Sequence, residues 1–322
     1  MIDPINRWQK SAALFFQASH ACSQVIHNAI WDAYMGAIGA ASIKMPVSLA
    51  AFPAAIAFSS LGALCLKISG TPYLLQRIND KGAMSKGQGL LLYNIGLLPG
   101  SLAQEMTVST EREFGMTHKR RRERLVSDVI ERFQSREIVV LQEAVDFGFI
   151  QLLKEQLEAD GHRAYLYSRI TGANPLVPGI ASGLCLLSHE RLEEVKVGRL
   201  PRSEPLFNRA FIAFRHKGRV IVSTHLRDGG DDDLRMEQLA SIAESIRCES
   251  CLIIGDLNFT SAITFDEMSL TSHMPFAEPT LRKGGGAPDM VATYGNAERP
   301  RSVHICKDAA YLSDHYPIEL DI

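Results

Sequence analysis

Residues 251–258, CLIIGDLN, join a buried apolar run to two polar side chains that point the same way. The run at 252–254 suits a strand buried on both faces. Asp256 and Asn258 follow two residues apart, and alternate residues of an extended chain lie on one side of it. We therefore expect a carboxylate and an amide to leave the end of this strand together, where loops of sheet proteins commonly carry chemistry. A plain Asp-Asn turn is the alternative.

Four further apolar runs end in an amide, a carboxylate or an imidazole. Residues 91–94 end in Asn94, residues 138–141 precede Gln142 and Glu143, residues 219–224 precede His225, and LSDHYP at 312–317 holds Asp314 and His315 before a final strand at 318–322. Five such endings in one chain are hard to explain by packing alone. Carboxylate and amide oxygens suit a hard cation such as Mg²⁺. Histidines at such positions can donate hydrogen bonds to a phosphate or transfer a proton.

Strands and helices alternate beyond residue 89, which indicates an α/β or α+β layered domain. The strands expected from apolar runs lie at 90–95, 137–141, 183–188, 210–215, 219–224 and 290–294, and the helices at 117–133, 147–160 and 234–247. The first helix begins with the basic run 119–122. Such a run is more typical of a solvated face than of a binding patch.

Residues 1–88 form a hydrophobic segment followed by a polar linker at 79–89. The run 45–66 has 22 residues without Asp, Glu, Lys or Arg, which is long enough to cross a bilayer as a helix. Residues 21–43, whose only such residue is Asp32, would be the weaker arm of a hairpin. Basic residues after the run place the rest of the chain on the cytoplasmic face. A pair of buried helices capping a soluble domain is the alternative.

Charge is unevenly distributed along the chain. Residues 1–88 carry a net charge of +4 and the remainder −6. An acidic body is a poor non-specific binder of nucleic acid, although it leaves room for a nuclease with a local basic groove. The six cysteines are scattered through apolar runs, which is typical of reduced, buried thiols. Cys248 and Cys251 have zinc-like spacing but lack the second Cys/His pair of a zinc site.

The polar strand endings, taken in order, resemble those of the endonuclease/exonuclease/phosphatase superfamily, the metal-dependent phosphoesterases related to DNase I and neutral sphingomyelinase. The matching pieces over residues 89–322 are LLYNIG, VVLQEA, SGLCLLS, VSTHL, IIGDLN, APDMV and LSDHYP. The resemblance implies a DNase I-like catalytic domain at 89–322, built as a two-sheet sandwich flanked by helices. Residues 1–88 lie outside it and would form a membrane anchor and linker.

The same resemblance implies a role for each polar residue. Mg²⁺, with Mn²⁺ as the alternative, would be bound by Asn94, Glu143 and Asp314. The catalytic residues implied are Asp256, which would position or deprotonate the attacking water, Asn258, which would contact the phosphate, Asp289, which would orient His315, and His225 and His315, which would donate hydrogen bonds or a proton. Two departures weaken the match to DNA-repair nucleases: no further acid follows Asn94 closely, and Met290 replaces the tyrosine common after Asp289.

The sequence therefore predicts a membrane-associated, Mg²⁺-dependent phosphodiesterase. The expected substrate is a phospholipid such as sphingomyelin, because the N-terminal segment is apolar, the body is acidic, and the SGLCLLS and THL pieces are present. A nuclease or an inositol-phosphate phosphatase of the same superfamily is the alternative within enzymes. An inactive membrane-bound interaction module is the alternative outside them, and the full set of eight polar residues argues against it.

Overall fold

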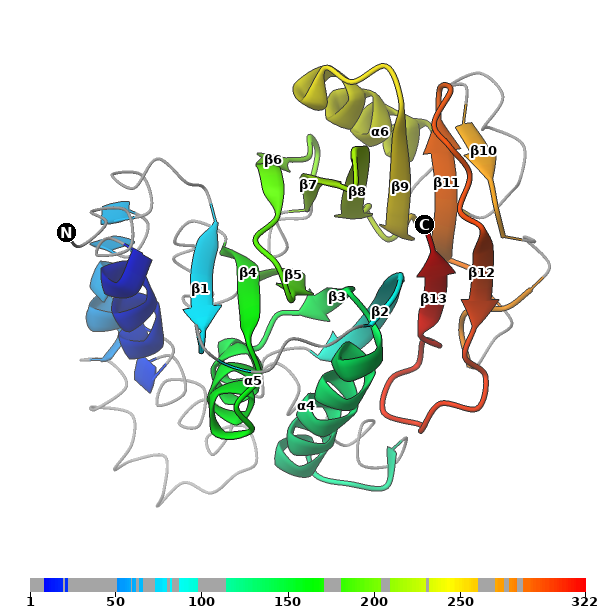
Figure 1. The fold of residues 1–322 in the computed structure, drawn as a ribbon. Helices are drawn as coiled ribbons and strands as arrows, with labels where there is room; N and C mark the ends of the chain where they lie inside the picture. Colours follow the sequence, from blue (N-terminus) through cyan, green and yellow to red (C-terminus); the bar gives the residue numbers. More distant parts are fainter. Residues whose placement is uncertain are drawn as a thin grey trace.

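The computed structural model describes residues 9–19, 21–22, 51–58, 60–61, 64–65, 73–79, 82, 87–97, 114–170, 181–203, 209–229, 232–259, 270–274, 278–282 and 286–322. Two sheets face each other at its centre (Figure 1). The seven-stranded sheet has the order β1 (Leu74–Ile78), β4 (Ala164–Ile170), β5 (Ala181–Ser188), β3 (Ile138–Ala144), β2 (Leu90–Leu97), β13 (Ile318–Asp321) and β12 (Ser302–Ile305). The six-stranded sheet has the order β10 (Leu270–Ser272), β11 (Asp289–Tyr294), β9 (Cys251–Asp256), β8 (Arg219–His225), β7 (Ala210–His216) and β6 (Glu193–Arg199).

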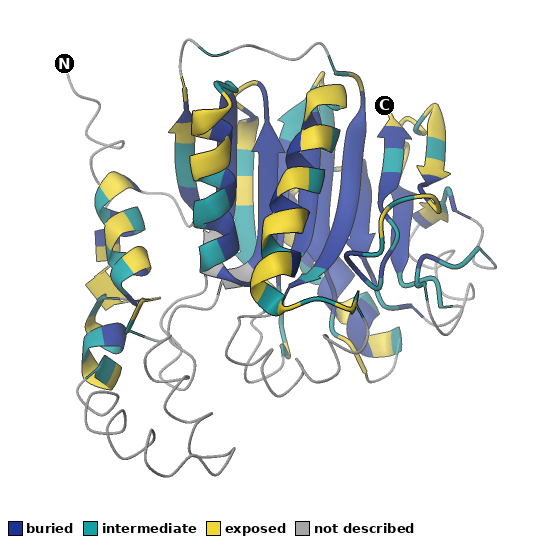
Figure 2. Cartoon of the chain, turned by 90° about the horizontal axis from the view of Figure 1, so that it is seen from below, coloured by how far each residue is buried: buried dark blue, intermediate teal, exposed yellow. Residues whose placement is uncertain are grey.

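Helices cover the outer face of each sheet. The helices α4 (His118–Ser135) and α5 (Phe147–Ala159) lie on the seven-stranded sheet, with exposed residues on their outer sides (Figure 2). Helix α6 (Asp232–Ile246) packs on the six-stranded sheet. Thr117 caps α4 by accepting the Arg120 N–H, and Asp146 caps α5 by accepting the Gly148 N–H. This two-sheet α/β sandwich flanked by helices confirms the predicted fold class.

Alternation along the strands decides which residues reach the layer between the sheets. On β2, Leu91 and Tyr93 pack under the helices, whereas Leu90 and Leu92 face the other sheet. Asn94 continues this inward row and contacts the opposite sheet. The same alternation puts Gln142, His225, Asp256 and Asp289 on the inward rows of β3, β8, β9 and β11. The apolar layer therefore becomes polar at one edge of the sandwich.

Every strand and helix expected beyond residue 89 is present, and the part of the chain that the structure describes holds five strands that were not expected from the sequence: β1, β4, β6, β10 and β12. Strand β1 pairs with β4 at the edge of the larger sheet, so that sheet extends into residues 1–88. Gln9 holds β1 through its amide, accepting Leu75 N–H at 2.8 Å and donating to the carbonyl of Tyr73 at 3.2 Å. Helical residues at 9–19 thus pack against the domain edge.

The predicted anchor falls partly outside the described residues, which include 51–58, 60–61 and 64–65 of the run at 45–66 and only 21–22 of the weaker arm. Within the part of the chain that the structure describes, no helix is both long and apolar enough to cross a membrane. Residues 51–58 are helical, and Ser19 donates to the carbonyl of Ala55 at 2.9 Å. This contact joins the two N-terminal helical stretches.

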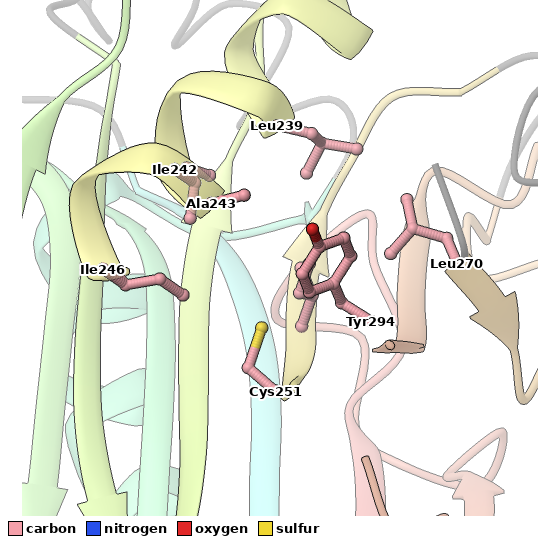
Figure 3. A pocket seen from close by; sticks show the side chains of 8 residues that line it. Leu239, Ile242, Ala243, Ile246, Cys251, Leu270 and Tyr294 are labelled. Carbon is pink, nitrogen blue, oxygen red and sulfur yellow. The ribbon is translucent and has the colours of Figure 1, made fainter. Parts of the chain in front are cut away.

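Cys251 belongs to the hydrophobic packing under α6. It lines an apolar cavity of about 10 Å³ between this helix and the sheet, together with Leu239, Ile242 and Tyr294 (Figure 3). Burial raises the pKa of the Cys251 thiol to about 12. A cavity of this size holds at most one water, and its lining is mostly aliphatic. The Cys251 thiol is therefore a protonated packing group.

Candidate active site

The strand directions bring the polar strand ends to one edge of the sandwich. Strands β2 and β3 are parallel, as are β8 and β9, so Asn94, Glu143, His225 and Asp256 all lie at carboxyl ends that meet. Strand β11 runs antiparallel to β9, and the register places Asp289 directly opposite Asp256. Strand β13 runs antiparallel to β2, so the residues before it return to the same edge.

Asn94 and His225 join carboxylates from both sheets. The Asn94 Nδ2 donates to Glu143 Oε1 at 3.2 Å and to Asp256 Oδ2 at 3.0 Å. His225 lies between the same two acids, with Nδ1 3.9 Å from Glu143 Oε1 and Nε2 3.6 Å from Asp256 Oδ2. Asn94, His225 and Asp256 are buried, and Glu143 is partly exposed. The centre is therefore an acidic pair held by an amide and an imidazole.

His315 forms a buried pair with Asp289. Its Nδ1 lies 2.6 Å from Asp289 Oδ2, and its Nε2 lies 4.0 Å from Asp256 Oδ2. Burial by itself would lower the pKa of His315, but the carboxylates of Asp289 and Asp256 raise it to about 10. The imidazole is therefore protonated at neutral pH, with Nδ1 engaged and Nε2 directed toward the acidic centre.

Burial disfavours the charged forms of the central carboxylates. Burial, followed by the charge of Asp289, raises the pKa of Asp256 to about 7. Burial is also the main cause of the raised pKa of Glu143, with Asp314 adding to it. Among the described residues, the Oδ1 atoms of Asp256 and Asp289 are buried without a hydrogen-bond partner. Such oxygen-rich sites with unpaired acceptors fit a hard divalent cation.

Two overlapping groups have ligand atoms within 4.8 Å of one another, one formed by Glu143, His225 and Asp256 and the other by Asp256, Asp289 and His315. Asp256 belongs to both groups, whereas Asp314 belongs to neither. Asp314 nevertheless lies at this edge, since a Cβ on Gly96 would be 2.9 Å from its Oδ1. Asp256 is thus a candidate ligand in addition to the predicted ligand Glu143.

Glu143 adopts a strained backbone conformation at the end of β3. Its φ of +52° is left-handed, which costs about 1–2 kcal/mol for a residue with a Cβ. Gly183 on the neighbouring strand lies against this backbone, and a Cβ there would be 3.2 Å from the Glu143 Cα and N atoms. The SGLCLLS piece therefore contributes a glycine that leaves room for the Glu143 turn. Strain of this kind commonly accompanies a functional site.

Asn258 follows the same strand as Asp256, as predicted. Its Nδ2 donates to the carbonyl of Leu226 at 3.2 Å, directly beyond His225, and its φ is +55°. The structure thus gathers all eight predicted residues at one edge. The roles implied for them are chemical proposals, developed below.

Gln142 is a site residue whose importance the sequence did not reveal. It is fully buried and bridges the two sheets, donating from Nε2 to the carbonyl of Thr224 at 2.5 Å and accepting Asp256 N–H at 2.9 Å. Gly255 leaves room for this bridge, because a Cβ there would lie 1.8 Å from the Thr224 oxygen. The sequence signal was a glutamine at the end of an apolar strand run. Its role becomes clear only from the facing sheet, which carries both of its hydrogen-bond partners.

Arg209 is a second residue that sequence reasoning missed. It precedes β7, which runs antiparallel to β8, and so lies beside the strand end that carries His225. Its backbone is fixed on both sides by hydrogen bonds with Ser203 and Leu200. Its charge lowers the pKa values of Glu143, Asp256 and His225, and together with burial it holds that of His225 well below its usual range. An arginine before a strand carries no distinguishing sequence signal.

No family model and no curated protein sequence matches the chain. Solved structures do match in fold. An endonuclease/exonuclease/phosphatase from Beutenbergia cavernae shares 19% identity over 73% of this chain and 70% of its own, with a TM-score of 0.51. Sphingomyelinase C from Streptomyces griseocarneus shares 16% sequence identity, and the match covers 74% of this chain and 99% of that protein, with a TM-score of 0.52. Staphylococcus aureus beta toxin with bound magnesium ions shares 14% sequence identity, and the match covers 73% of this chain and 99% of that protein, with a TM-score of 0.52.

Proposed function

We propose that this chain, which has the fold of endonuclease/exonuclease/phosphatase proteins, is a metal-dependent phosphodiesterase. The observation that carries the proposal is the meeting of Asn94, Glu143, His225 and Asp256 across the two sheets. Among the described residues, the buried Oδ1 atoms of Asp256 and Asp289 have no hydrogen-bond partner, which costs stability that apolar packing does not return. Phosphodiester hydrolysis needs a cation at the phosphoryl oxygens and groups that hold and move protons beside it.

Glu143 would hold the cation, with Asp256 within reach and Asp314 close by. Asn94 would join them through Oδ1 once its amide turns over, because here Nδ2 faces the acids and Oδ1 accepts the Gly96 N–H at 3.0 Å. The donor set is carboxylate and amide oxygen, which favours Mg²⁺ and admits Mn²⁺. When bound, the cation would neutralise charge on the phosphoryl oxygens. Arg209 supplies a permanent positive charge at the same edge, and phosphate recognition favours arginine.

The remaining residues orient water and move protons. Asp256 would accept the proton of the attacking water at Oδ1, the oxygen for which the described residues provide no partner. His315 would donate from Nε2 to a phosphoryl oxygen, because Asp289 already engages Nδ1. His225, neutral because of its lowered pKa, would donate one N–H to the phosphate. Asn258 would contact the phosphate from the loop after β9.

The substrate we propose is a phospholipid of the sphingomyelin type. Three features support it: a fold shared with a sphingomyelinase, an acidic body that disfavours nucleic acid, and an apolar N-terminal segment. The experiment assays the full chain on sphingomyelin vesicles, plasmid DNA and inositol phosphates, with Mg²⁺, Mn²⁺ or EDTA. Metal-dependent release of phosphocholine is the expected result. If the chain cleaves only DNA or only inositol phosphates, and does so with metal, the sphingomyelin proposal is wrong and that compound is the substrate class. Inactivity on all three would favour an interaction module.

Membrane association is the accompanying proposal, with the catalytic domain on the cytoplasmic side. Large apolar side chains are exposed in the N-terminal helical stretches, with Leu14 66% exposed, and Leu61 and Leu64 exposed near the end of the uncharged run. Residues 1–88 also carry a net charge of +4, which favours anionic lipid headgroups. Apolar side chains beside basic residues are typical of segments that lie in the membrane interface.

The membrane proposal predicts that the full chain binds vesicles of phosphatidylcholine and phosphatidylserine. Replacing Leu14, Leu61 and Leu64 together by serine should reduce the bound fraction severalfold, because about 1.5–3 kcal/mol is gained for each such side chain fully removed from water. Sedimentation with vesicles, in low and high salt, measures the effect. Equal binding by the wild-type and triple-serine proteins, or a wild-type protein that stays in solution, would contradict the proposal.

A further inference from the structure

Arg121 lies inside the basic run at 119–122, yet it is only 4% exposed. The run as a whole was expected to form a solvated face, and Lys119 and Arg120 do so. Arg121 instead points from the first turn of α4 toward the edge that carries the active-site residues. Burying a guanidinium costs several kcal/mol unless hydrogen bonds compensate for the lost water. Its contacts therefore indicate what this residue stabilises.

The Arg121 guanidinium donates to three backbone carbonyls. The Nε atom donates to Leu312 at 2.7 Å, Nη1 to Gly96 at 2.9 Å, and Nη2 to Ile95 at 2.7 Å. Ile95 and Gly96 directly follow Asn94, whereas Leu312 precedes Asp314 and His315 by two and three residues. One side chain thus ties the end of β2 to the loop before β13.

A second set of contacts runs through the same place. Ser313 Oγ donates to the carbonyl of Asn94 at 2.7 Å and accepts the N–H of His315 at 3.2 Å. The Phe114 ring covers the guanidinium with its centroid 4.2 Å from the Arg121 Cζ, and Tyr311 packs against that ring at 5.0 Å. These contacts add a second connection between the β2 end and the loop before β13, with two aromatic rings packed beside the guanidinium.

There is little spare room at this junction. Gly96 has a φ of +52°, and a Cβ on it would lie 2.9 Å from Asp314 Oδ1 and 3.5 Å from Arg121 Nη2. The end of β2 at Gly96 therefore lies close to both the guanidinium and the Asp314 carboxylate. A planar fork of donors can serve three carbonyls at once, which a single ammonium group cannot do in the same geometry.

We propose that Arg121 is a positioning residue that fixes Asn94 relative to Asp314 and His315. The assignment of a catalytic purpose to this geometry rests on the proposed function. Arg121 touches no reacting atom; it acts through the two backbone segments that it joins. Misplacing catalytic groups by about 1 Å can cost about 10²-fold in rate. Loss of the residues that orient metal ligands commonly costs 10–100-fold in metal affinity.

The experiment compares Arg121→Met and Arg121→Lys with Arg120→Met, a matched control in the same run whose side chain is exposed. Arg121→Met should lower kcat by about 10²-fold and change KM less, and Arg121→Lys should recover part of the loss. Calorimetric titration with Mn²⁺ should show about 10-fold weaker binding or more for Arg121→Met. Amide hydrogen exchange should quicken at 94–97 and 312–316 while β8 and β9 stay protected. Arg120→Met should behave as the wild type.

Each result decides the matter. Uniformly faster exchange, with activity falling only in proportion to the folded fraction, would show a general stabilising role and overturn the proposal. Wild-type exchange and Mn²⁺ binding in Arg121→Met would also overturn it. If Arg121→Met does not fold, Arg121→Lys carries the same local exchange test. If the wild type hydrolyses none of the substrates, local exchange and weakened Mn²⁺ binding still support Arg121 as a positioning residue, and only the proposed function fails.

Discussion

Glu143→Gln should lower the rate of phosphodiester hydrolysis by about 10²-fold or more, the usual cost of removing one strong electrostatic contact to the transition state. The substitution keeps the size of the side chain and removes its charge. Glu143 is the partly exposed acid of the central cluster, so a cation entering from solvent would meet its carboxylate. Its strained backbone already directs the side chain toward Asn94 and His225.

Glu137→Gln is the matched control for Glu143→Gln. Glu137 directly precedes β3, at the end opposite Glu143, where it pairs with His216 at 2.9 Å and Lys217 at 2.7 Å. The same chemical change there should leave turnover near the wild-type value. Initial rates across a Mg²⁺ titration, with Mn²⁺ binding measured by calorimetry, test both variants. Near-normal turnover and cation affinity in Glu143→Gln would show that Glu143 is not the chief ligand.

His315→Ala should lower kcat by about 10²–10⁴-fold, the range for losing a general acid or base. Asp289→Asn should cost less, because the imidazole stays in place and loses only the acceptor that fixes Nδ1–H. The two residues are 26 positions apart, so only the fold brings them to 2.6 Å. Residues that act as one unit give strongly non-additive losses. The double variant should therefore be little worse than His315→Ala.

All four proteins of this cycle should be assayed for kcat and KM on the best substrate found. The effect should fall on kcat more than on KM, since the pair serves the transition state. Thermal unfolding of each variant separates lost chemistry from lost stability. Losses that simply multiply, or a nearly silent Asp289→Asn, would mean that Asp289 is a turn residue after Pro288 and that no dyad operates.

The sequence by itself determined the layered fold and most of the residues that gather at the candidate site. Apolar runs ending in polar residues are a local pattern, and period-two alternation states which side chains share a face. Asn94, His225 and Asp256 could be identified in this way, because each continues an inward row and needs no knowledge of its neighbours. The same reasoning missed β1 and β4, which pair at the edge of the larger sheet.

Only the tertiary structure decided which of these groups meet. Asp289 lies opposite Asp256 because β11 runs antiparallel to β9, a choice of direction that no local pattern encodes. Gln142 and Arg121 have polar side chains whose purpose depends on partners 82 and 191 residues away. Such residues look like an ordinary buried amide and an ordinary helix-surface cation in the sequence. Burial and hydrogen bonding are properties of the assembled sandwich, and their energies arise only when both sheets are in place.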